Sequence, residues 1–419
     1  MHVSFKIGYQ EHIVEIREEN LLGVLTQNAV LVSAVGEAAV RQALDHPIGT
    51  KRLGDLVNPG EKIAIVTSDI TRPMPTWQVM PVLLDELYAA GAHPEDITLV
   101  FALGSHRSHT EEERRHLAGE RAYNEIRCVD SDPLDCIHMG CTAAHTPVDI
   151  TRVVAEADRR ICLGNIEYHY FAGYSGGAKA IMPGVSTREA IQANHRMMVR
   201  KEACAGNLES NPVRNDIEEA AAICGIDFIL NVILDEKKQI IKAVAGDAIA
   251  AHRAGCSFLD TLYRKEIPER ADIVLVSQGG APKDLNLYQT QKALDNAKHA
   301  VKTGGVIILM GSCKEGYGGK VFEEWLRAAP DSHSLIQRIQ QDFQLGGHKA
   351  AAIAMVLENA DIYMVSDMPD TLVRGAFMVP YHSVQDAYDA AVKKCGPQAT
   401  VLAMPYGGST FPQEMSRSN

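Results

Sequence analysis

The 419-residue chain lacks several features that would assign it to common protein classes. No apolar run approaches the roughly 18 residues of a membrane-spanning helix, and the first residues do not resemble an apolar leader. The net charge is −12 and there is no long run of lysine or arginine, which argues against nucleic acid or an anionic membrane as the main partner. The GxxxxGK[ST] phosphate loop and the HExxH zinc motif are both absent.

Paired cysteines are also lacking. The nine cysteines are an odd number, and no two of them form a CxxC pair. This usage is typical of reduced thiols rather than of a disulfide framework. We therefore expect the protein to be cytoplasmic.

What the chain does contain is an alternation of short apolar runs with helical patterns, at 46% hydrophobic and 22% charged residues. Continuous apolar strands that alternate with helices indicate parallel sheets covered on both faces. We predict an α/β fold with two domains, each a largely parallel sheet flanked by helices. The expected strands are 62–68, 97–103, 160–163, 228–234, 239–244, 273–276, 306–309, 362–365 and 401–404, of which 228–234 and 239–244 form a hairpin. A helix is expected from about Thr76 to Ala90, and another begins after Thr110 as its N-cap.

A charged segment with a proline, residues 263–270, is the predicted linker. It divides the chain into an N-terminal cofactor- and substrate-binding domain, residues 1–266, and a C-terminal domain, residues 267–404, that closes the site. The tail at 405–419 is rich in Gly, Ser and Pro. It either packs back on the first domain or frays.

Unusual polar groups follow the predicted strand ends. Asp69, His106 and His169 each come after a strand of the first domain, and residues 283–292 follow a strand of the second. Ligands of open α/β sheets bind beyond the carboxyl ends of strands. We expect these groups to share one active site in the cleft between the domains.

Two of these groups suit carboxylate binding and proton transfer. Arg72, close to Asp69, offers a fork that can hold a carboxylate through two hydrogen bonds, although a surface Asp–Arg pair that caps the next helix would look the same. His106 can act as a general acid or base near neutral pH, or it can cap its neighbouring helix. His109 and His116 are expected to be ordinary exposed residues.

The segment from His169 to His195 contains several residues that can bind a ligand, a metal or a covalent cofactor. Glycines at 173, 176 and 177 permit a sharp turn close to a ligand. Lys179 in that turn is a phosphate partner, a Schiff-base amine or a covalent anchor, and His195 can ligate a transition metal. The alternative is a tight strand-to-helix turn with a solvent-exposed lysine.

A fourth cluster lies in the second domain. Tyr288, Gln289 and Lys292 share one face of a predicted helix, where they can meet an anionic substrate or cofactor. The alternative is a polar helix face with no ligand.

Together these motifs resemble the nickel-dependent lactate racemase family of 2-hydroxyacid racemases and epimerases. The matching motifs are D-x-TRP at 69–73, G-[ST]-HR at 104–107, H-x-F-x-G-x-SGG-x-K-x-x-x-PG at 169–184, NH at 194–195 and NLYQ-x-QKA at 286–293. They occur in the family's order and extend over most of the chain, so the joint signal is stronger than any single motif.

The resemblance implies a cofactor, the nickel-pincer nucleotide, a pyridinium mononucleotide that holds nickel through sulfur, carbon and sulfur. It implies a covalent tether at Lys179 and a fourth nickel ligand at His195. The remaining cofactor-binding residues would be Gly173, Ser175, Gly176 and Gly177.

The resemblance also implies an isomerase that racemises or epimerises a 2-hydroxyacid by reversible hydride transfer to the cofactor. His106 and His169 would be the acid and base. The substrate-binding residues would be Asp69, Arg72, Tyr288, Gln289 and Lys292. Proteins that make the cofactor would be needed as partners, and a homodimer is compatible with the sequence.

One departure from the family bears on the substrate. Members that act on lactate carry a tryptophan near the substrate, but the segment 346–349 has none, and His348 or Lys349 there suits a larger hydroxyacid or a sugar acid. The alternative functions are an NAD-dependent hydroxyacid dehydrogenase or epimerase, and a paralogue that binds the cofactor without turnover.

Overall fold

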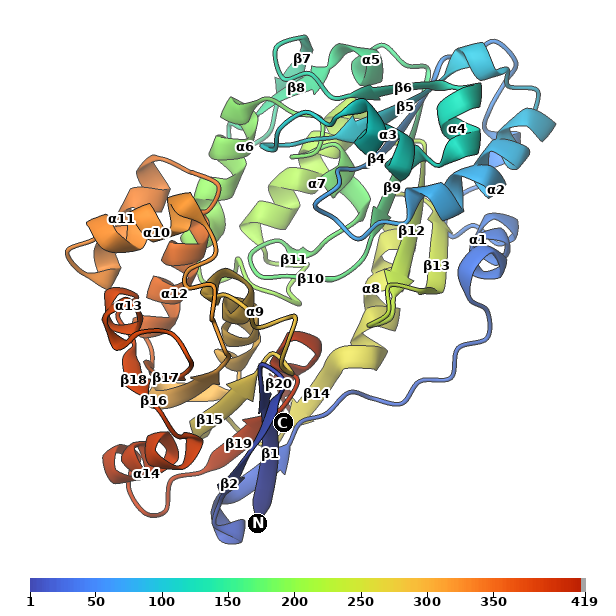
Figure 1. Ribbon diagram of the computed structural model, residues 1–419. Coiled ribbons are helices and arrows are strands. Elements are labelled where there is room, and N and C mark those ends of the chain that lie inside the picture. The colour runs from blue at the N-terminus through green and yellow to red at the C-terminus, as the bar shows by residue number, and fades with distance from the viewer. Residues whose placement is uncertain (416–419) are drawn as a thin grey trace. The chain divides into compact units, whose positions relative to one another are not determined.

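The computed structural model describes residues 1–415 and confirms the predicted α/β class. The chain forms two compact units, which Figure 1 shows coloured along the sequence. Residues 30–260 make one unit, called here the catalytic unit. Residues 1–29 together with those from 261 onward make the other, called here the C-terminal unit.

The catalytic unit is built on a six-stranded sheet among its described residues, in the order β13-β12-β9-β4-β5-β6. All neighbours in it are parallel except β12 and β13, which form the expected antiparallel hairpin. The strands are β4 (Ile63–Ser68), β5 (Ile97–Ala102), β6 (Arg127–Asp130), β9 (Arg159–Asn165), β12 (Phe228–Leu234) and β13 (Ile240–Gly246).

Helices and two small hairpins surround this sheet. The helices are α1 (Gly36–Asp45), α2 (Thr76–Ala89), α3 (Glu111–Ala118), α4 (Glu120–Glu125), α5 (Arg152–Ala155), α6 (Arg188–His195), α7 (Pro212–Cys224) and α8 (Ala250–Tyr263). The hairpins pair β7 (Cys136–Cys141) with β8 (Pro147–Thr151), and β10 (Tyr168–His169) with β11 (Gly173–Tyr174).

The core of this unit follows from the strand pattern. Alternate strand residues such as Ile65, Leu99 and Ile161 are fully buried against apolar side chains of α1 and α2. Helix α3 begins where the sequence predicts, because Thr110 and Glu113 form a reciprocal capping box. The capping residues of α3 and the buried strand residues both agree with the sequence pattern. The core therefore fixes the strand ends that carry the candidate residues.

The C-terminal unit contains a second six-stranded sheet within the described chain, ordered β18-β17-β16-β15-β19-β3 and parallel throughout. Its strands are β3 (Leu21–Val24), β15 (Ala271–Ser277), β16 (Val301–Met310), β17 (Asp361–Val365), β18 (Val379–Tyr381) and β19 (Val401–Met404). Its helices are α9 (Leu287–Ala297), α10 (Lys320–Ala328), α11 (Ser332–Gln341), α12 (Gly347–Leu357), α13 (Asp370–Gly375) and α14 (Val384–Cys395).

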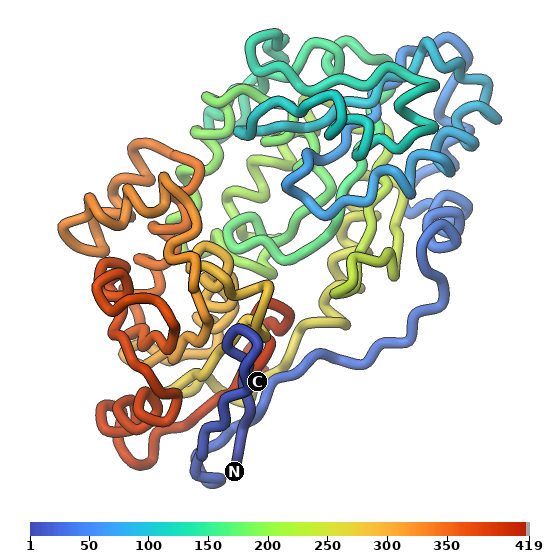
Figure 2. The backbone as a smooth tube through the Cα atoms, viewed as in Figure 1, coloured from blue at the N-terminus to red at the C-terminus, as the bar shows by residue number. Residues whose placement is uncertain are grey.

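The N-terminal segment belongs to this second unit, which differs from the expected domain of residues 1–266. Its hairpin of β1 (His2–Ile7) and β2 (Gln10–Glu15) packs apolar residues such as Phe5 into the core with Ile273 and Val306. Strand β3 then extends the sheet beside β19. Figure 2 shows this blue segment running along the red end of the chain. The pairing joins residues almost 380 positions apart, by the register Leu21 to Val401, and no local pattern reveals it.

The predicted linker and tail also differ from expectation. Residues 264–267 of the linker form strand β14 (Arg264–Ile267), which pairs in parallel with β20 (Phe411–Glu414) from the tail. The tail therefore packs within the C-terminal unit and not on the first domain. Residues 416–419 of the predicted tail lie outside the described residues.

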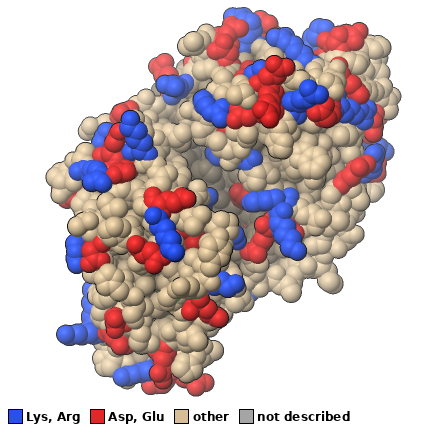
Figure 3. All heavy atoms as spheres, in the orientation of Figure 1, with Lys and Arg blue, Asp and Glu red and all other residues tan. Residues whose placement is uncertain are grey.

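The described part of the chain holds no helix that is both long enough and apolar enough to cross a membrane. Figure 3 shows acidic and basic side chains intermixed on the visible face, so the charge of −12 is not gathered there into a field of one sign.

An ion pair outside the site gives a prediction about acid stability. Arg159 donates from Nε and Nη2 to the two carboxylate oxygens of Glu61 at 2.8 Å each, and this pair lowers the pKa of Glu61 to about 2. The stabilisation is complete above pH 4.5, the ordinary value for Glu, and is lost as the pH falls toward 2. Glu61→Gln should cost about 2 kcal/mol of unfolding free energy at pH 7 and progressively less in acid.

Urea unfolding between pH 7 and pH 3 measures this effect. The matched control is Glu323→Gln, which removes an exposed pair with Arg327 and should change stability by less than about 0.5 kcal/mol. A Glu61→Gln cost that does not shrink as the pH falls would contradict the role assigned to the Glu61 charge.

Candidate active site

A buried phenylalanine gathers three of the predicted site residues. Phe171, only 3% exposed, lies in the loop between β10 and β11. Its ring centroid is 4.5 Å from that of His169 and 4.9 Å from that of His195, both in edge-to-face geometry. The amine of Lys179 lies 5.8 Å from the same ring. The sequence analysis missed Phe171, although it stands inside the motif that carries the resemblance.

Buried polar groups hold this hairpin in place. The guanidinium of Arg214, on α7, is fully buried and donates to the carbonyl oxygens of Ala172 and Tyr174. The hydroxyls of Tyr168 and Tyr174 both donate to Asp260 on α8, at 2.6 and 2.7 Å. The loop around Phe171 is therefore fixed by hydrogen bonds from two helices.

The glycine turn that follows has no room for side chains. Gly176 and Gly177 both have positive φ, +75° and +58°. A Cβ on Gly176 would lie 2.8 Å from Oδ1 of Asn231, the same atom that accepts the Gly177 N–H at 2.7 Å. This turn leads into a short 3-10 helix (Gly177–Ala180) that carries Lys179.

Ser175 has a structural role within that turn. The letters Gly173 to Gly177 fit the G-x-S-x-G pattern of a nucleophile elbow. The Ser175 hydroxyl, however, donates to the carbonyl of Asn165 at 2.7 Å and accepts the N–H of Glu167 at 2.8 Å. Both of these bonds go to the backbone, so this serine is not activated by a base and pins the turn to the end of β9.

His106 and Asp69 form a hydrogen-bonded pair at neighbouring strand ends. Nδ1 of His106, after β5, lies 2.7 Å from Oδ2 of Asp69, after β4. Burial of Asp69 opposes its ionisation, but the hydrogen bond from His106 and the charge of Arg72 outweigh burial and lower the pKa of Asp69. An ionised Asp69 accepts from Nδ1–H, which leaves the lone pair of His106 on Nε2.

Arg72 connects this pair with the hairpin loop. It is exposed, and its Nη1 donates to the hydroxyl of Thr71 at 3.1 Å. Its positive charge contributes to the lowered pKa values of Asp69, His169 and Lys179. The first three strand-end groups predicted from the sequence, Asp69, His106 and His169, therefore belong to one electrostatic site in the catalytic unit.

The ring proton of His169 is on the other nitrogen from that of His106. Its Nδ1 accepts the backbone N–H of Ala172 at 3.2 Å, so the proton of the neutral ring is on Nε2. Burial, followed by the charges of Lys179 and Arg72, holds the pKa of His169 well below its ordinary value. The site thus presents one imidazole with a lone pair on Nε2 and another with a proton on Nε2.

The surroundings of Lys179 are those of a buried amine, so Lys179 is not the solvent-exposed lysine of the alternative interpretation. Burial, together with the charges of Arg214 and Arg72, lowers the pKa of Lys179 well below its ordinary value. A lowered pKa supplies neutral amine, the nucleophilic form, near neutral pH. This environment suits a covalent anchor.

Competitive labelling with acetic anhydride tests this environment. The labelling midpoint of Lys179 in the cofactor-free protein should lie well below that of Lys320, whose side chain is 89% exposed. Arg72→Ala removes a like charge and should raise the midpoint of Lys179 toward that of Lys320. Equal midpoints for the two lysines in the unmodified chain would contradict the assigned environment.

His195 has its ring proton fixed by a neighbour. Its Nδ1 lies 2.8 Å from Oδ1 of Asn194, whose amide nitrogen donates to Asp216 at 2.7 Å and to Val213. Because the amide must present its nitrogen to Asp216, its oxygen faces His195, and the ring carries its proton on Nδ1. The lone pair is then on Nε2, as in a histidine that ligates a metal with a supporting partner.

The residues around the turn fit an anionic cofactor that brings its own metal ligands. Within residues 1–415 no group of three or more His, Cys, Asp or Glu side chains is arranged to hold a metal ion, so a metal bound by His195 would need further ligands from the cofactor. The buried nitrogens Nδ2 of Asn165, Nδ2 of Asn231 and Nη1 of Arg214 have no hydrogen-bond partner among the described residues. Three buried donors around the turn that carries Lys179 suit anionic groups.

The fourth predicted cluster lies on α9 of the C-terminal unit. Tyr288 and Gln289 are half-buried, and Lys292, one turn after Tyr288, is exposed. Asn286 caps the helix by accepting the N–H of Gln289 at 3.1 Å. The predicted helix and its shared face are therefore present in this unit.

Comparison with known proteins identifies two family domains in the chain. The family models described as the lactate racemase N-terminal domain and the lactate racemase C-terminal domain match residues 7–206 and 267–411. The chain belongs to the lactate racemase family. It is accordingly an enzyme of the isomerase class.

Relatives in the lactate racemase family match the chain along nearly all of its length. The lactate racemase of Thermoanaerobacterium thermosaccharolyticum is 32% identical over 425 residues, covering 99% of both chains. That of Lactiplantibacillus plantarum is 33% identical over 420 residues, covering 97% of this chain and 98% of the relative.

Solved structures confirm the fold. The lactate racemase apoprotein from Thermoanaerobacterium thermosaccharolyticum matches with a TM-score of 0.87 at 31% identity, over 99% of this chain and 100% of that one. A protein from Thermotoga maritima shares the fold at 18% identity, with a TM-score of 0.62 over 92% of this chain and all of that one.

Within the lactate racemase family, the departure at residues 346–349 has a structural basis in this chain. Trp325, on α10, is fully buried, and Gly347 at the start of α12 packs directly on its indole ring. Trp325 is thus a core residue beneath α12. The buried amine of Lys349 instead lies 5.7 Å from the ring of Tyr288 and donates to Gln291 at 2.8 Å.

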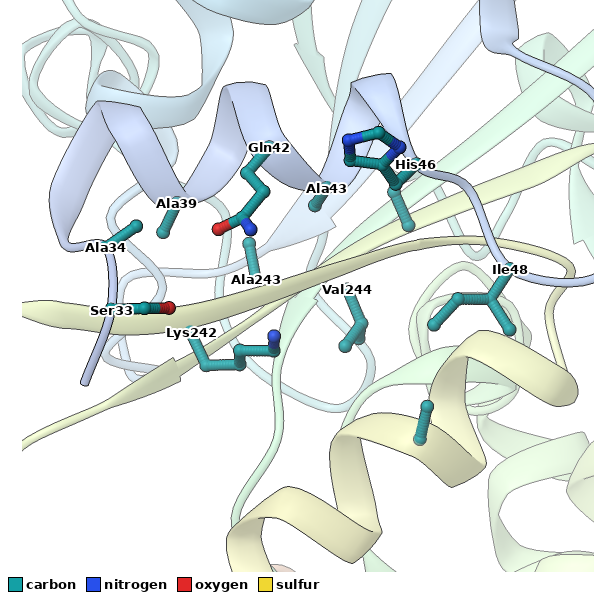
Figure 4. Close-up of a pocket in the computed structure, with 12 residues that line it drawn as sticks. Ser33, Ala34, Ala39, Gln42, Ala43, His46, Ile48, Lys242, Ala243 and Val244 are labelled. Carbon is teal, nitrogen blue, oxygen red and sulfur yellow. The ribbon is translucent and has the colours of Figure 1, made fainter. Parts of the chain in front are cut away.

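A separate cavity of about 310 Å³ lies between α1 and β13 of this lactate racemase family member. Figure 4 shows the side chains of Gln42, His46 and Lys242 around it. Its lining residues include none of the catalytic, cofactor-binding or metal-binding residues predicted from the sequence. It is therefore distinct from the candidate active site.

Proposed function

We propose that this enzyme racemises lactate with His106 and His169 as acid and base and with a nickel-pincer nucleotide tethered to Lys179. The observation that carries the proposal is the pair of imidazoles with opposite proton positions, close to Arg72 and a buried amine. The names of the relatives support lactate as the substrate, because both are described as lactate racemases.

The reaction explains why such a cofactor is needed. The hydrogen at C2 of a 2-hydroxyacid is a poor acid beside a carboxylate, because its loss as a proton would place a second negative charge next to the first. When bound, the cofactor supplies an acceptor that takes this hydrogen as hydride and returns it. The residues of the chain then have to transfer the hydroxyl proton and bind the substrate carboxylate.

His106 suits the removal of the hydroxyl proton. Its Nε2 lone pair accepts that proton, while ionised Asp69 holds Nδ1–H and stabilises the imidazolium that forms. In the same direction of reaction, His169 in its imidazolium form donates from Nε2 to the carbonyl oxygen after the flat 2-keto acid has rotated, and it is left as the neutral ring. In the reverse direction the two histidines exchange these roles.

The remaining residues hold the substrate and the cofactor. Arg72 would grip the substrate carboxylate with its two parallel donors, and Tyr288, Gln289 and Lys292 are the proposed contribution of the C-terminal unit. Lys179 would form the tether and the Nε2 atom of His195 would bind nickel. Gly173, Ser175, Gly176 and Gly177 would form the cofactor turn, where Asn165, Asn231 and Arg214 offer donors to anionic groups.

A second substrate class is favoured by one observation in the C-terminal unit. Lys349 places a buried cation beside the ring of Tyr288, where an indole would offer only an apolar surface. Such a cation suits a larger hydroxyacid or a sugar acid that carries further oxygen atoms. This candidate keeps the same reaction and the same acid and base residues.

The test is a panel of single-enantiomer 2-hydroxyacids incubated with protein made alongside cofactor-synthesising proteins. Chiral chromatography should show D- and L-lactate reaching equal amounts, and the protein should contain about one nickel per chain. Faster conversion of a larger hydroxyacid would select the second substrate class. NAD-dependent oxidation without nickel would overturn the proposal, and nickel binding without turnover would indicate a binding paralogue.

A further inference from the structure

A hydrogen-bonded chain reaches the active site from the far side of β5, through a histidine that is not among the predicted site residues. His109 is 7% exposed, which corrects the expectation of an ordinary exposed residue. Its ring packs edge-on against the buried Phe101, with centroids 5.5 Å apart. The sequence gives little sign of this burial, because His109 follows a polar turn and precedes a charged helix.

The proton position of His109 follows from its two neighbours. Its Nε2 lies 3.1 Å from the backbone nitrogen of Ile70, which can only donate. Nε2 must therefore carry a lone pair. The proton is then on Nδ1, which donates to Oδ1 of Asp130 at 2.6 Å, while Oδ2 of Asp130 accepts the His109 backbone N–H at 2.9 Å.

The Ile70 N–H, which His109 accepts, belongs to the turn that carries the carboxylate of Asp69. Ile70 directly follows Asp69, and the turn closes with the Arg72 N–H donating to the Asp69 carbonyl at 3.1 Å. Ile70, Thr71 and Arg72 are all exposed, so packing contributes little to their position. The bond from His109 therefore ties an otherwise exposed turn to the sheet.

We infer that His109 is a positioning residue that, through Ile70, holds the Asp69 carboxylate against Nδ1 of His106. The inference rests on the proposed function, in which His106 is the catalytic base. Asp130 fixes the proton of His109, His109 fixes the peptide of Ile70, and the peptide fixes Asp69. A displacement of about 1 Å in a catalytic group can cost about 100-fold in rate.

Two substitutions separate the two bonds of His109. His109→Gln places an oxygen near the position of Nε2 and keeps an acceptor for Ile70. His109→Asn reaches only to the position of Nδ1, and keeps the bond to Asp130 while it loses the acceptor. We expect kcat to fall about 10- to 100-fold in the Asn variant and less than about threefold in the Gln variant, with cofactor loading unchanged. His116→Ala, at an exposed histidine of the adjoining helix, is the control and should leave activity unchanged.

The second readout does not use activity. Long-range ¹⁵N NMR of the cofactor-free protein should show Nδ1–H on both His106 and His109 in the unmodified chain. The Asn variant should lose the single Nδ1–H form of His106, and the Gln variant should retain it. A His109 with its proton on Nε2 would overturn the inference without any variant.

Other outcomes also decide the inference. Equal activity in the Asn and Gln variants, with the His106 tautomer unchanged in both, would overturn it and leave His109 a purely structural residue. If His106→Ala leaves racemisation intact, the proposed function fails. The tautomer of His106 in the Asn variant then still decides whether His109 positions Asp69.

Discussion

Replacing His106 with alanine should lower kcat for racemisation by about 10²–10⁴-fold, the usual contribution of general acid–base catalysis. The variant should retain the proposed tethered cofactor, because His106 is not among the residues proposed to hold it. Asp69→Asn should also lower kcat, by at least about tenfold, since a neutral amide does not stabilise an imidazolium and can turn its nitrogen instead of its oxygen toward the ring. Chiral chromatography measures the rates, and intact mass measures the loading.

The adjacent residue provides the control for this result. Arg107 pairs with Glu113 through two hydrogen bonds at the surface, and Arg107→Ala should leave kcat within about twofold of the unmodified enzyme. If His106→Ala retained more than half of the activity while Arg107→Ala did not, the role of the base would have been assigned to the wrong residue.

The second large effect is expected at Lys179. Lys179→Met keeps an unbranched chain above the ring of Phe171 but removes the amine, so no covalent attachment can form. Racemisation should fall to background, and the intact mass should equal that of the bare chain. The matched control is Lys242→Met, at a lysine that lies over the ring of Phe258 at the same distance of 5.8 Å and should leave attachment unchanged.

The free energy of unfolding shows whether Lys179→Met loses activity because the amine is missing or because the protein is less stable. The pKa of Lys179 is lowered in the folded protein, so at neutral pH the unfolded chain binds a proton that the folded chain resists. Removing the amine removes that cost, and cofactor-free Lys179→Met should be about 1 kcal/mol more stable than the unmodified protein at pH 7. A variant that unfolds more easily would contradict the burial of a functional amine.

The parts of the fold that local patterns specify were predictable. Strand β4 was expected at 62–68 and spans Ile63–Ser68, and the helix expected from Thr76 is α2. Apolar runs of this length are buried on both faces of a parallel sheet, so they stand out in the sequence. The N-terminal segment was not predictable in this way, because β3 joins a strand almost 380 residues away.

The candidate site also contains some residues that local motifs predict and others that they do not. His106, His169, Lys179 and His195 stand in motifs and were expected. Their supports, such as Arg214, Asp216 and Asp130, come from other elements and have ordinary local sequences. Burial of His109 depends on the packing of Phe101 and on a carboxylate at the end of β6, which a pattern of single residues does not encode.

Predictions that concern the cell and the assembly stay predictions. These are the cytoplasmic location, the homodimer and the need for proteins that make the cofactor. Fractionation, light scattering and co-expression address them one by one. None of them alters the roles assigned to His106, His169 and Lys179.

The fate of the hydrogen at C2 tests the central claim most directly. Lactate that carries deuterium at C2 should be racemised in ordinary water with the deuterium kept in both enantiomers, because the hydrogen moves as hydride and never joins the exchangeable protons of His106 or His169. Mass spectrometry of the separated enantiomers measures the label. Loss of deuterium to solvent at the rate of racemisation would show proton abstraction at carbon and would contradict the account.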